Sequence, residues 1–260
     1  MNKKDDRQNA DERPNYGNLG IFPVNEFDNF ADGYDAGMSD PVKQLFGKSE
    51  EAFIYAKAVW LRNYLVRHHV SILNIVQEPK VLDYGCGTGL FLSVLKKINF
   101  KADLFGCDVS HKMLHEATLR WQGSPPPKLN LLDSEVLPYE NDTFDLVIAC
   151  CVFHHIPSSF RSNVCEEIAR VIKPNGMFFI FEHNPLNPIT TWIVGRAAVD
   201  ANAELLKASE AKNLLSASGF KDPGVQYLLF FPPRWPSLNS LERLFKFIPL
   251  GAQWVAFGRR

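Results

Sequence analysis

The sequence lacks three features that would narrow its function at once: a long apolar run, an excess of charge and paired cysteines. No apolar stretch approaches the ~20 residues that a transmembrane helix needs, so we expect peripheral membrane contact at most. The chain carries 28 Lys and Arg against 29 Asp and Glu, a net charge of −1 over 260 residues. This balance gives no chain-wide attraction to nucleic acid or to anionic membranes.

The five cysteines form no C-x-x-C pair and no framework of the secreted type. The N-terminal stretch "MNKKDDRQNADERPN" also lacks the apolar segment of a signal peptide. Together these observations predict a protein of the reducing cytoplasm.

What the sequence does contain divides it into three parts. Residues 1–18 are charged and polar with almost nothing to bury, which predicts a disordered tail. Residues 80–260 are long enough for one substantial core. Residues 19–79 predict an N-terminal helical lead-in, because apolar and aromatic side chains recur there at helical spacing: Phe53, Ala56, Val59, Trp60, Asn63 and Tyr64.

From residue 80 onward the chain alternates short β-rich runs with amphipathic helical segments, which predicts a mostly parallel sheet flanked by helices. The last two strands break this alternation, because no helix is expected between them. The turn residues "KPNG" at 173–176 end one helix and start the next strand. Strands are expected at 80–84, 102–107, 128–132, 144–149, 176–182, 225–231 and 252–258, and helices near 89–98, 110–121, 159–172, 188–205 and 208–218.

The most informative stretch is "KVLDYGCGTGLF" at residues 80–91, in which Asp83 precedes three alternating glycines. Such glycines let the backbone lie against a ligand where a Cβ would collide. A dinucleotide loop has the spacing G-x-G-x-x-G, one residue longer than the G-x-G-x-G found here. A carboxylate at Asp83 repels a pyrophosphate but suits a cationic ligand, such as the ammonium and sulfonium of S-adenosylmethionine.

Two further carboxylates follow the next predicted strands. Asp108 lies 25 residues after Asp83 (108 − 83) and can accept hydrogen bonds from both ribose hydroxyls in either ligand class. It therefore supports a nucleoside ligand without choosing between the two classes. Asp133 follows the third strand, where it is either an acceptor for an adenine amino group or a turn residue.

In order and spacing, the segments "VLDYGCGTG", "GCDVS", "LLDSEVLPYENDTFDLVIACCVFHHIP" and "EEIARVIKPNGMFFIFEHN" resemble the successive motifs of class I S-adenosylmethionine-dependent methyltransferases. The resemblance covers about residues 80–183. It implies an α/β fold with a Rossmann-like, doubly wound, seven-stranded sheet, mostly parallel with the last strand antiparallel. The implied cofactor is S-adenosyl-L-methionine, lying over the ends of the first strands.

The same resemblance implies cofactor contacts from the glycine loop, from the ends of the following strands and from an aromatic lid in the lead-in. These contacts are Asp83, Gly85, Cys86, Gly87, Asp108, Val109, Met113, Asp133, Ser134, Cys150 and Tyr34, with Phe30 as a second lid residue.

Methyl transfer to a hydroxyl requires a group that takes up the proton. "FHHIP" supplies His154 and His155 just past the fourth strand, and we predict His155 as the general base. "FEHNP" supplies Glu182 and His183 past the fifth strand, where either could orient an acceptor. Structural hydrogen bonding remains the alternative for each. No ligand spacing typical of a metal site is present, so no metal is predicted.

The acceptor side is expected to form from the lead-in and two insertions, 185–206 and 232–250. In the second insertion Leu238, Leu241, Leu244, Phe245 and Ile248 lie along one helical face. That face could pack on the sheet, cover the substrate, or contact a lipid-linked acceptor or membrane surface. The Asn-Pro-Pro-aromatic motif of enzymes that methylate nucleobase amines is missing after the fourth strand, which argues against nucleic acid.

The sequence as a whole predicts a cytoplasmic methyltransferase with a catalytic domain at 80–260. Its acceptor is expected to be a small molecule or glycan-type, sugar-containing compound, methylated at oxygen. Two alternatives stay open: a cofactor-binding protein without turnover, and an N- or C-methyltransferase for a lipid-linked or quinone-like acceptor. A nicotinamide-dependent oxidoreductase is disfavoured by the glycine spacing and by Asp83. Sequence reasoning leaves the oligomeric state open.

Overall fold

The computed structural model describes most of the chain from residue 49 onward. The described residues are 27–28, 49–68, 78–134, 136–233, 235, 238 and 241–260. The tail predicted at 1–18 and the lid residues Phe30 and Tyr34 lie outside them.

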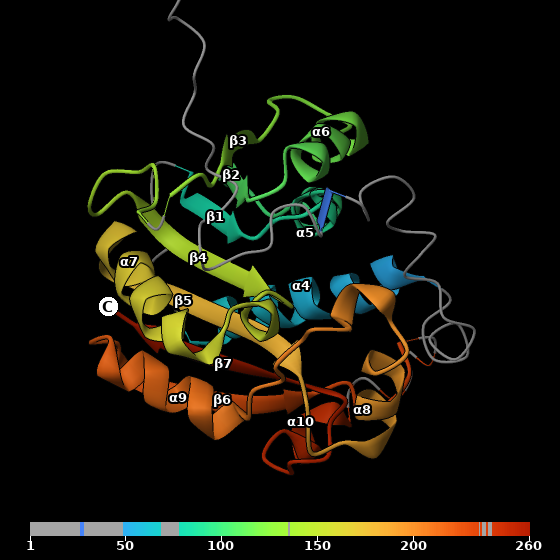
Figure 1. The fold of residues 1–260 in the computed structure, drawn as a ribbon. Coiled ribbons are helices and arrows are strands. Elements are labelled where there is room, and N and C mark those ends of the chain that lie inside the picture. The colour runs from blue at the N-terminus through green and yellow to red at the C-terminus, as the bar shows by residue number, and fades with distance from the viewer. Residues whose placement is uncertain are drawn as a thin grey trace, which may run out of the picture.

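The described residues build one seven-stranded sheet, shown in Figure 1. Its strands are β1 (Lys80–Tyr84), β2 (Asp103–Asp108), β3 (Lys128–Leu131), β4 (Phe144–Cys150), β5 (Ile172–His183), β6 (Lys221–Leu228) and β7 (Gln253–Arg259). Their order is β3-β2-β1-β4-β5-β7-β6. β1 to β5 run parallel, whereas β7 pairs antiparallel with both β5 and β6. The predicted Rossmann-like sheet with an antiparallel last strand is confirmed.

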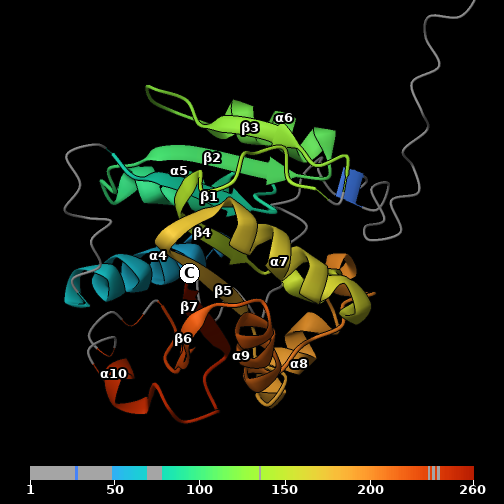
Figure 2. The ribbon, with the colours of Figure 1, turned by 90° about the vertical axis from the view of Figure 1, so that its left-hand side faces the viewer.

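Helices cover both faces of the sheet, so the strands are apolar on both faces. Neighbouring residues such as Val81 and Leu82 belong to two different hydrophobic clusters, because successive side chains point to opposite faces. On one face lie α4 (Glu50–Arg67), α5 (Leu90–Lys97) and α6 (His111–Arg120), and on the other lie α7 (Arg161–Val171) and α9 (Ala208–Ala217) (Figure 2). In the described residues, no helix combines the length and apolarity that crossing a bilayer requires.

The buried face of α4 differs from the predicted one. Of the six positions expected from helical spacing, only Tyr64 is buried. The helix instead buries Ile54, Lys57, Ala58, Leu61, Tyr64 and Leu65. Val59 and Trp60 pack at the edge of the cluster and stay half-buried. The spacing thus indicated a helix but not its buried face, because aromatic side chains can contact a core from its rim, while a lysine side chain can lie inside it when its ammonium finds partners.

The prediction for "KPNG" also needs correction, because β5 begins at Ile172 rather than at Gly176. The pairing with β4 shifts register between Phe144 and Leu146, and Asn175 has φ 69°. Phe144 pairs with Ile172 and Leu146 with Met177, so residues 173–176 have no partner on β4. The turn residues therefore interrupt the pairing with β4, although β5 as a whole begins before them.

The helix predicted at 188–205 is shorter than expected, since the first insertion holds α8 (Pro188–Val194) and a 3₁₀ turn (Ala198–Asp200). The described residues of the second insertion include the single-turn α10 (Glu242–Phe245). The helical face expected over 238–248 lies partly outside the described residues and stays a prediction. Among its described residues, Leu244 is 74% exposed, and Phe245 stacks on the rings of Phe230 and Phe231.

Candidate active site

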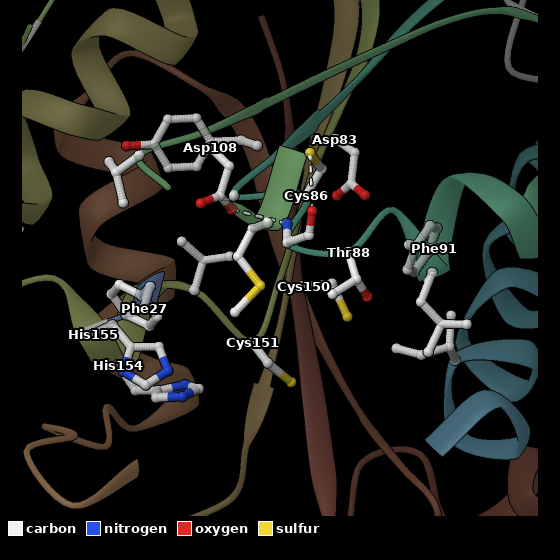
Figure 3. Close-up of a pocket in the computed structure, with 18 of the residues that line it drawn as sticks. Phe27, Asp83, Cys86, Thr88, Phe91, Asp108, Cys150, Cys151, His154 and His155 are labelled. Atoms are coloured by element: carbon white, nitrogen blue, oxygen red, sulfur yellow. Dashed lines mark hydrogen bonds between the residues drawn. The ribbon is translucent and has the colours of Figure 1, made fainter. Parts of the chain in front are cut away.

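A pocket lies at the edge of the sheet where β1, β2 and β4 end (Figure 3). It encloses about 1080 Å³, part of it open to solvent. In open α/β sheets, ligands bind at the carboxyl ends of parallel strands. Most of the predicted site residues line this pocket: Asp83, Gly85, Cys86, Gly87, Asp108, Val109, Met113, Cys150, His155 and His183.

The glycine loop turns sharply between β1 and α5. Gly85 and Gly87 have φ of 70° and 50°, in the left-handed region that favours glycine. A Cβ on Gly85 would lie 2.6 Å from a side-chain atom of Val152, whereas a Cβ on Gly87 would meet nothing within 4 Å. Gly85 is therefore required by packing, and the space beside Gly87 is open to a ligand.

Asp83 is buried beneath this loop, with 2% of its surface exposed. Its Oδ2 atom has no hydrogen-bond partner among the described residues. Burial and the nearby Asp108 carboxylate raise the pKa of Asp83 to about 8. A buried carboxylate without a partner is costly, and a cationic ligand group would relieve that cost.

Asp108 ends β2 on the other side of the loop. Its Oδ2 accepts a hydrogen bond from the backbone N–H of Gly87 at 2.8 Å, and its Oδ1 accepts one from the N–H of Ser110 at 3.0 Å. Burial raises the pKa of Asp108, although these backbone donors oppose the shift. Each carboxylate oxygen has a second lone pair, so the side chain is fixed in place and can still accept from a ligand.

Some predicted cofactor residues are not in the pocket. Asp133 and Ser134 are exposed, and Leu132 lines the pocket in their place. Their contact with the cofactor stays a prediction. Tyr34 lies outside the described residues, while Phe27 lines the pocket and packs edge-on against His155, with ring centroids 5.1 Å apart. Phe27 belongs to the same aromatic cluster, "FDNFADGYDAG", but sequence reasoning assigned the lid to Phe30 and Tyr34 instead.

The two adjacent cysteines at the end of β4 share a buried cation. Lys57 of α4 is 1% exposed, and its Nζ lies 3.3 Å from the Sγ atoms of both Cys150 and Cys151. Burial opposes the ammonium, but the two thiols and Glu50 outweigh it and raise the pKa of Lys57. The hydrogen bond from Cys150, followed by Lys57 and His183, lowers the pKa of Cys151 well below its ordinary value. Sequence reasoning did not find this group.

A second polar cluster closes the far end of the pocket, where Figure 3 shows His154 and His155 side by side. His154 Nδ1 lies 2.5 Å from Glu182 Oε2. The opposite ring nitrogen, Nε2, lies 3.4 Å from Asp200 Oδ1. His155 Nε2 lies 3.6 Å from the same oxygen.

Burial disfavours both imidazolium ions, but the two pKa values shift in opposite directions. For His154, Glu182 and Asp200 outweigh burial and raise the pKa to about 10. For His155, burial and the neighbouring His154 lower the pKa to about 4. His155 is therefore neutral at pH 7, and its lowered pKa makes it a weak base.

Glu182 does not point at an acceptor. It is 0% exposed, does not line the pocket, and accepts a hydrogen bond from the backbone N–H of Phe153 at 2.7 Å as well as contacting His154. Its geometry fits the alternative of structural hydrogen bonding. His183 does line the pocket, and its Nδ1 lies 3.3 Å from Gln253 Nε2.

A mostly apolar cavity of about 810 Å³ adjoins the first, and both are lined by Glu50 and His183. It lies among α8, the segment after β6 and the start of β7, where the predicted insertions meet. Its apolar lining consists mainly of Phe53, Ile189, Ile193, Val194, Leu229, Phe230, Phe231, Pro232 and Pro233.

A family model described as a methyltransferase domain matches residues 82–180. The chain is 30% identical over 117 residues to a tRNA (carboxymethyluridine(34)-5-O)-methyltransferase of Arabidopsis thaliana. That match covers 43% of this chain and 27% of the relative, so the chain spans about a quarter of that protein's length. Because a relative is named for tRNA, the comparisons do not support the prediction against nucleic acid.

The chain is also 30% identical over 166 residues to the demethylmenaquinone methyltransferase of Lactobacillus johnsonii, covering 54% of this chain and 67% of the relative. A solved structure of a methyltransferase from Thermotoga maritima, described as a possible histamine N-methyltransferase, has the same fold. It matches with a TM-score of 0.61 at 17% identity, covering 90% of this chain and 98% of that one. From its matched domain, its relatives and its sheet, the chain belongs to the class I S-adenosylmethionine-dependent methyltransferases, enzymes whose cofactor is S-adenosylmethionine.

Proposed function

We propose that this chain transfers a methyl group from S-adenosylmethionine to a hydroxyl oxygen of a small-molecule or sugar-containing acceptor. One observation carries the cofactor part of the proposal: the Asp83 carboxylate is buried at the end of β1 with an oxygen that lacks a partner. That arrangement suits the ammonium of the cofactor's amino acid end.

The other residues of the pocket fit the same ligand. Gly87 leaves the space beside the loop free, and Asp108 has lone pairs left for the ribose hydroxyls. Val109, Met113 and Leu132 line the same pocket and offer apolar contact to a flat base. Bound S-adenosylmethionine supplies a methyl group attached to a positively charged sulfur, which is transferred by in-line displacement.

The residues of this chain would then bind the acceptor, exclude water and remove a proton. The apolar cavity meets the first pocket at His183 and Glu50, so an acceptor seated in it can extend a hydroxyl toward the cofactor site. Alignment of this kind supplies much of the rate of a displacement reaction. His155 lines the first pocket beside Asp200 and is placed to accept the hydroxyl proton.

The lining of the apolar cavity favours a small molecule over tRNA. Its described lining residues include no Lys or Arg, the side chains that hold a phosphate backbone. The apolar wall indicates an acceptor with an aromatic, prenyl or acyl part near the methylated atom. A quinone-like or lipid-linked acceptor fits this wall as well, which keeps that predicted alternative in the proposal.

Calorimetry tests the cofactor part directly. S-adenosylhomocysteine should bind with micromolar affinity and NADH should not bind, and the reverse result would refute the proposal. Asp108→Ala should weaken S-adenosylhomocysteine binding by about 1–3 kcal/mol, because charge-assisted hydrogen bonds are lost. Asp103→Ala, at the other end of β2, is the matched control and should bind normally.

The acceptor is found by incubating the chain with labelled cofactor and metabolite or polar-lipid extracts. Label in a hydroxyl-bearing small molecule supports the proposal. Label only in tRNA, or binding of S-adenosylhomocysteine without label in any pool, contradicts it.

A further inference from the structure

Three side chains converge at one point of the pocket wall: His154, His155 and Asp200. The two histidines lie in the 3₁₀ turn after β4, and Asp200 lies in the turn after α8. One ligand atom from each lies within 4.8 Å of the other two. We propose that these three side chains bind a divalent transition-metal ion of the zinc class, which the sequence analysis did not predict.

The distances suit a shared ion better than direct hydrogen bonds. His154 Nε2 and His155 Nε2 lie 3.4 Å and 3.6 Å from the same oxygen, Asp200 Oδ1. An N–H···O bond usually has an N···O distance of about 2.7–3.2 Å. A tetrahedral ion with bonds of about 2.1 Å holds its ligand atoms about 3.4 Å apart. The two distances therefore match the edges of such a site.

The residues behind His154 have the arrangement found around metal-bound histidines. Glu182 Oε2 lies 2.5 Å from His154 Nδ1 and so holds that nitrogen in its protonated form. This leaves Nε2, on the other side of the ring, free to bind an ion. A carboxylate bonded to the second ring nitrogen of a histidine ligand is the usual way in which proteins orient it. Glu182 is itself fixed by the N–H of Phe153.

Charge balance supports the same assignment. Glu182 and Asp200 place two carboxylates in a buried cluster, with 0% and 8% of their surfaces exposed. In the ion-free protein the His154 imidazolium offsets only one of these two charges. The other two buried cations among the described residues are bound elsewhere: Lys57 contacts the thiols of β4, and Arg161 contacts backbone carbonyls, Glu204 and Glu210. A divalent ion with two neutral histidines makes the cluster of His154, His155, Glu182 and Asp200 neutral, which lowers the cost of burying it.

The combination of two imidazoles and one carboxylate indicates which ions fit. Such ligands suit zinc, iron, cobalt and manganese rather than calcium. Three protein ligands leave the fourth tetrahedral position open, as in catalytic zinc sites, and here the three side chains line the pocket.

This open position gives the ion a role in the proposed reaction. A hydroxyl bound to the ion would have a lower pKa and would release its proton to water in the pocket, which is partly open to solvent. With the ion bound, His155 would act as a metal ligand, and water would replace it as the proton acceptor of the proposed function. That role rests on the proposed function, but the binding of the ion does not.

Metal binding is tested on the full chain without a histidine tag, stripped with a chelator and titrated with Co²⁺, then with competing Zn²⁺. We expect one equivalent of Co²⁺ with the visible absorption of a tetrahedral site. Glu182→Gln should weaken Zn²⁺ binding by about 10- to 100-fold, and Asp200→Asn and His155→Ala should weaken it further. His115→Ala, at an exposed position on α6, is the control and should leave binding unchanged.

Circular dichroism and S-adenosylhomocysteine calorimetry on each variant separate loss of the site from loss of the fold. Wild-type protein that takes up no stoichiometric Co²⁺ overturns the metal site, as does equal uptake by wild type and Asp200→Asn. S-adenosylhomocysteine binding with no metal uptake refutes the site and leaves the proposed function standing. Metal uptake without S-adenosylhomocysteine binding refutes the proposed function and leaves the site standing.

Discussion

The two ends of the pocket are built in different ways. The cofactor end, comprising Asp83, the glycine loop and Asp108, comes from one strand–loop–helix–strand unit. The other end, where we propose that the acceptor binds, is called the acceptor end. It draws on α4, the end of β4, β5 and the turn after α8, and includes Lys57, Cys151, His154, His155, Glu182, His183 and Asp200. Local sequence is enough to specify the first end. The acceptor end forms only when segments distant in the sequence pack together. Its charged side chains therefore pair with residues that sequence spacing cannot identify.

The largest expected effect is at the acceptor end. Glu182→Ala should lower the free energy of unfolding by about 3–5 kcal/mol, because it removes the partner of a buried imidazolium and of a buried N–H group. Urea denaturation in the presence of a chelator measures this loss. Glu166→Ala, at an exposed position on α7, is the control and should change stability by no more than about 0.5 kcal/mol. A loss below 1 kcal/mol for Glu182→Ala would show that the acceptor end is not held by this contact.

At the cofactor end, substitution of two glycines of the same loop should affect two different properties, the stability of the fold and the affinity for the cofactor. Gly85→Ala combines a left-handed backbone with a clash against Val152, and should cost about 2–4 kcal/mol of stability. Gly87→Ala meets no atom, and should cost about 1 kcal/mol while its methyl group occupies ligand space. Thermal melts and S-adenosylhomocysteine calorimetry measure both. Equal loss of stability in the two variants would contradict the assignment of the space beside Gly87 to a ligand.

The same contrast explains what the sequence could predict. The strand pattern and the glycine loop follow from local patterns, which are apolar runs and glycine spacing. The antiparallel last strand was implied by the family resemblance, and the helix-free connection agrees with it. Lys57 was missed because a lysine on a helix normally indicates a solvated face. Asp200 was missed because it lies 45 residues after His155 (200 − 155), and only the path of the insertion brings the two together.

The pH dependence of cofactor binding gives a finer test of the cofactor end. Asp83, with its pKa near 8, is largely protonated at pH 6.5 and becomes a carboxylate as the pH rises. The facing groups are Asp108, Cys86, Cys107 and Cys150, and the pKa values of the three thiols are raised, so they stay neutral. S-adenosylhomocysteine should therefore bind more tightly as the pH increases, by up to about tenfold per pH unit below pH 8.

Calorimetry at pH 6.5, 7.5 and 8.5 measures this trend, and Asp83→Asn should abolish it. The pH dependence of the folding stability has the opposite sign. The folded pKa lies above the unfolded value of about 3.9, so Asp83 reduces the stability of the ligand-free protein as the pH rises from about 4 to 8. Asp83→Asn should flatten that decline as well. The same pH slope of affinity in wild type and variant would exclude Asp83 as the partner of the ammonium.

The smallest expected effect concerns the Lys57 ammonium beside the cysteines at the end of β4. Lys57→Met keeps the length of the side chain but removes the ammonium 3.3 Å from Cys151 Sγ, so the pKa of Cys151 should rise toward its ordinary value. The pH at which iodoacetamide alkylates Cys151, located by mass spectrometry, should shift upward, whereas Lys96→Met on the exposed side of α5 should not change it. An unchanged profile would mean that the hydrogen bond from Cys150 alone lowers the pKa. In that case the charge of Cys151 would be set by its neighbour in the sequence, and local sequence would specify it as it specifies the cofactor end. Only the cluster around His154 would then distinguish the acceptor end as a site built from distant segments.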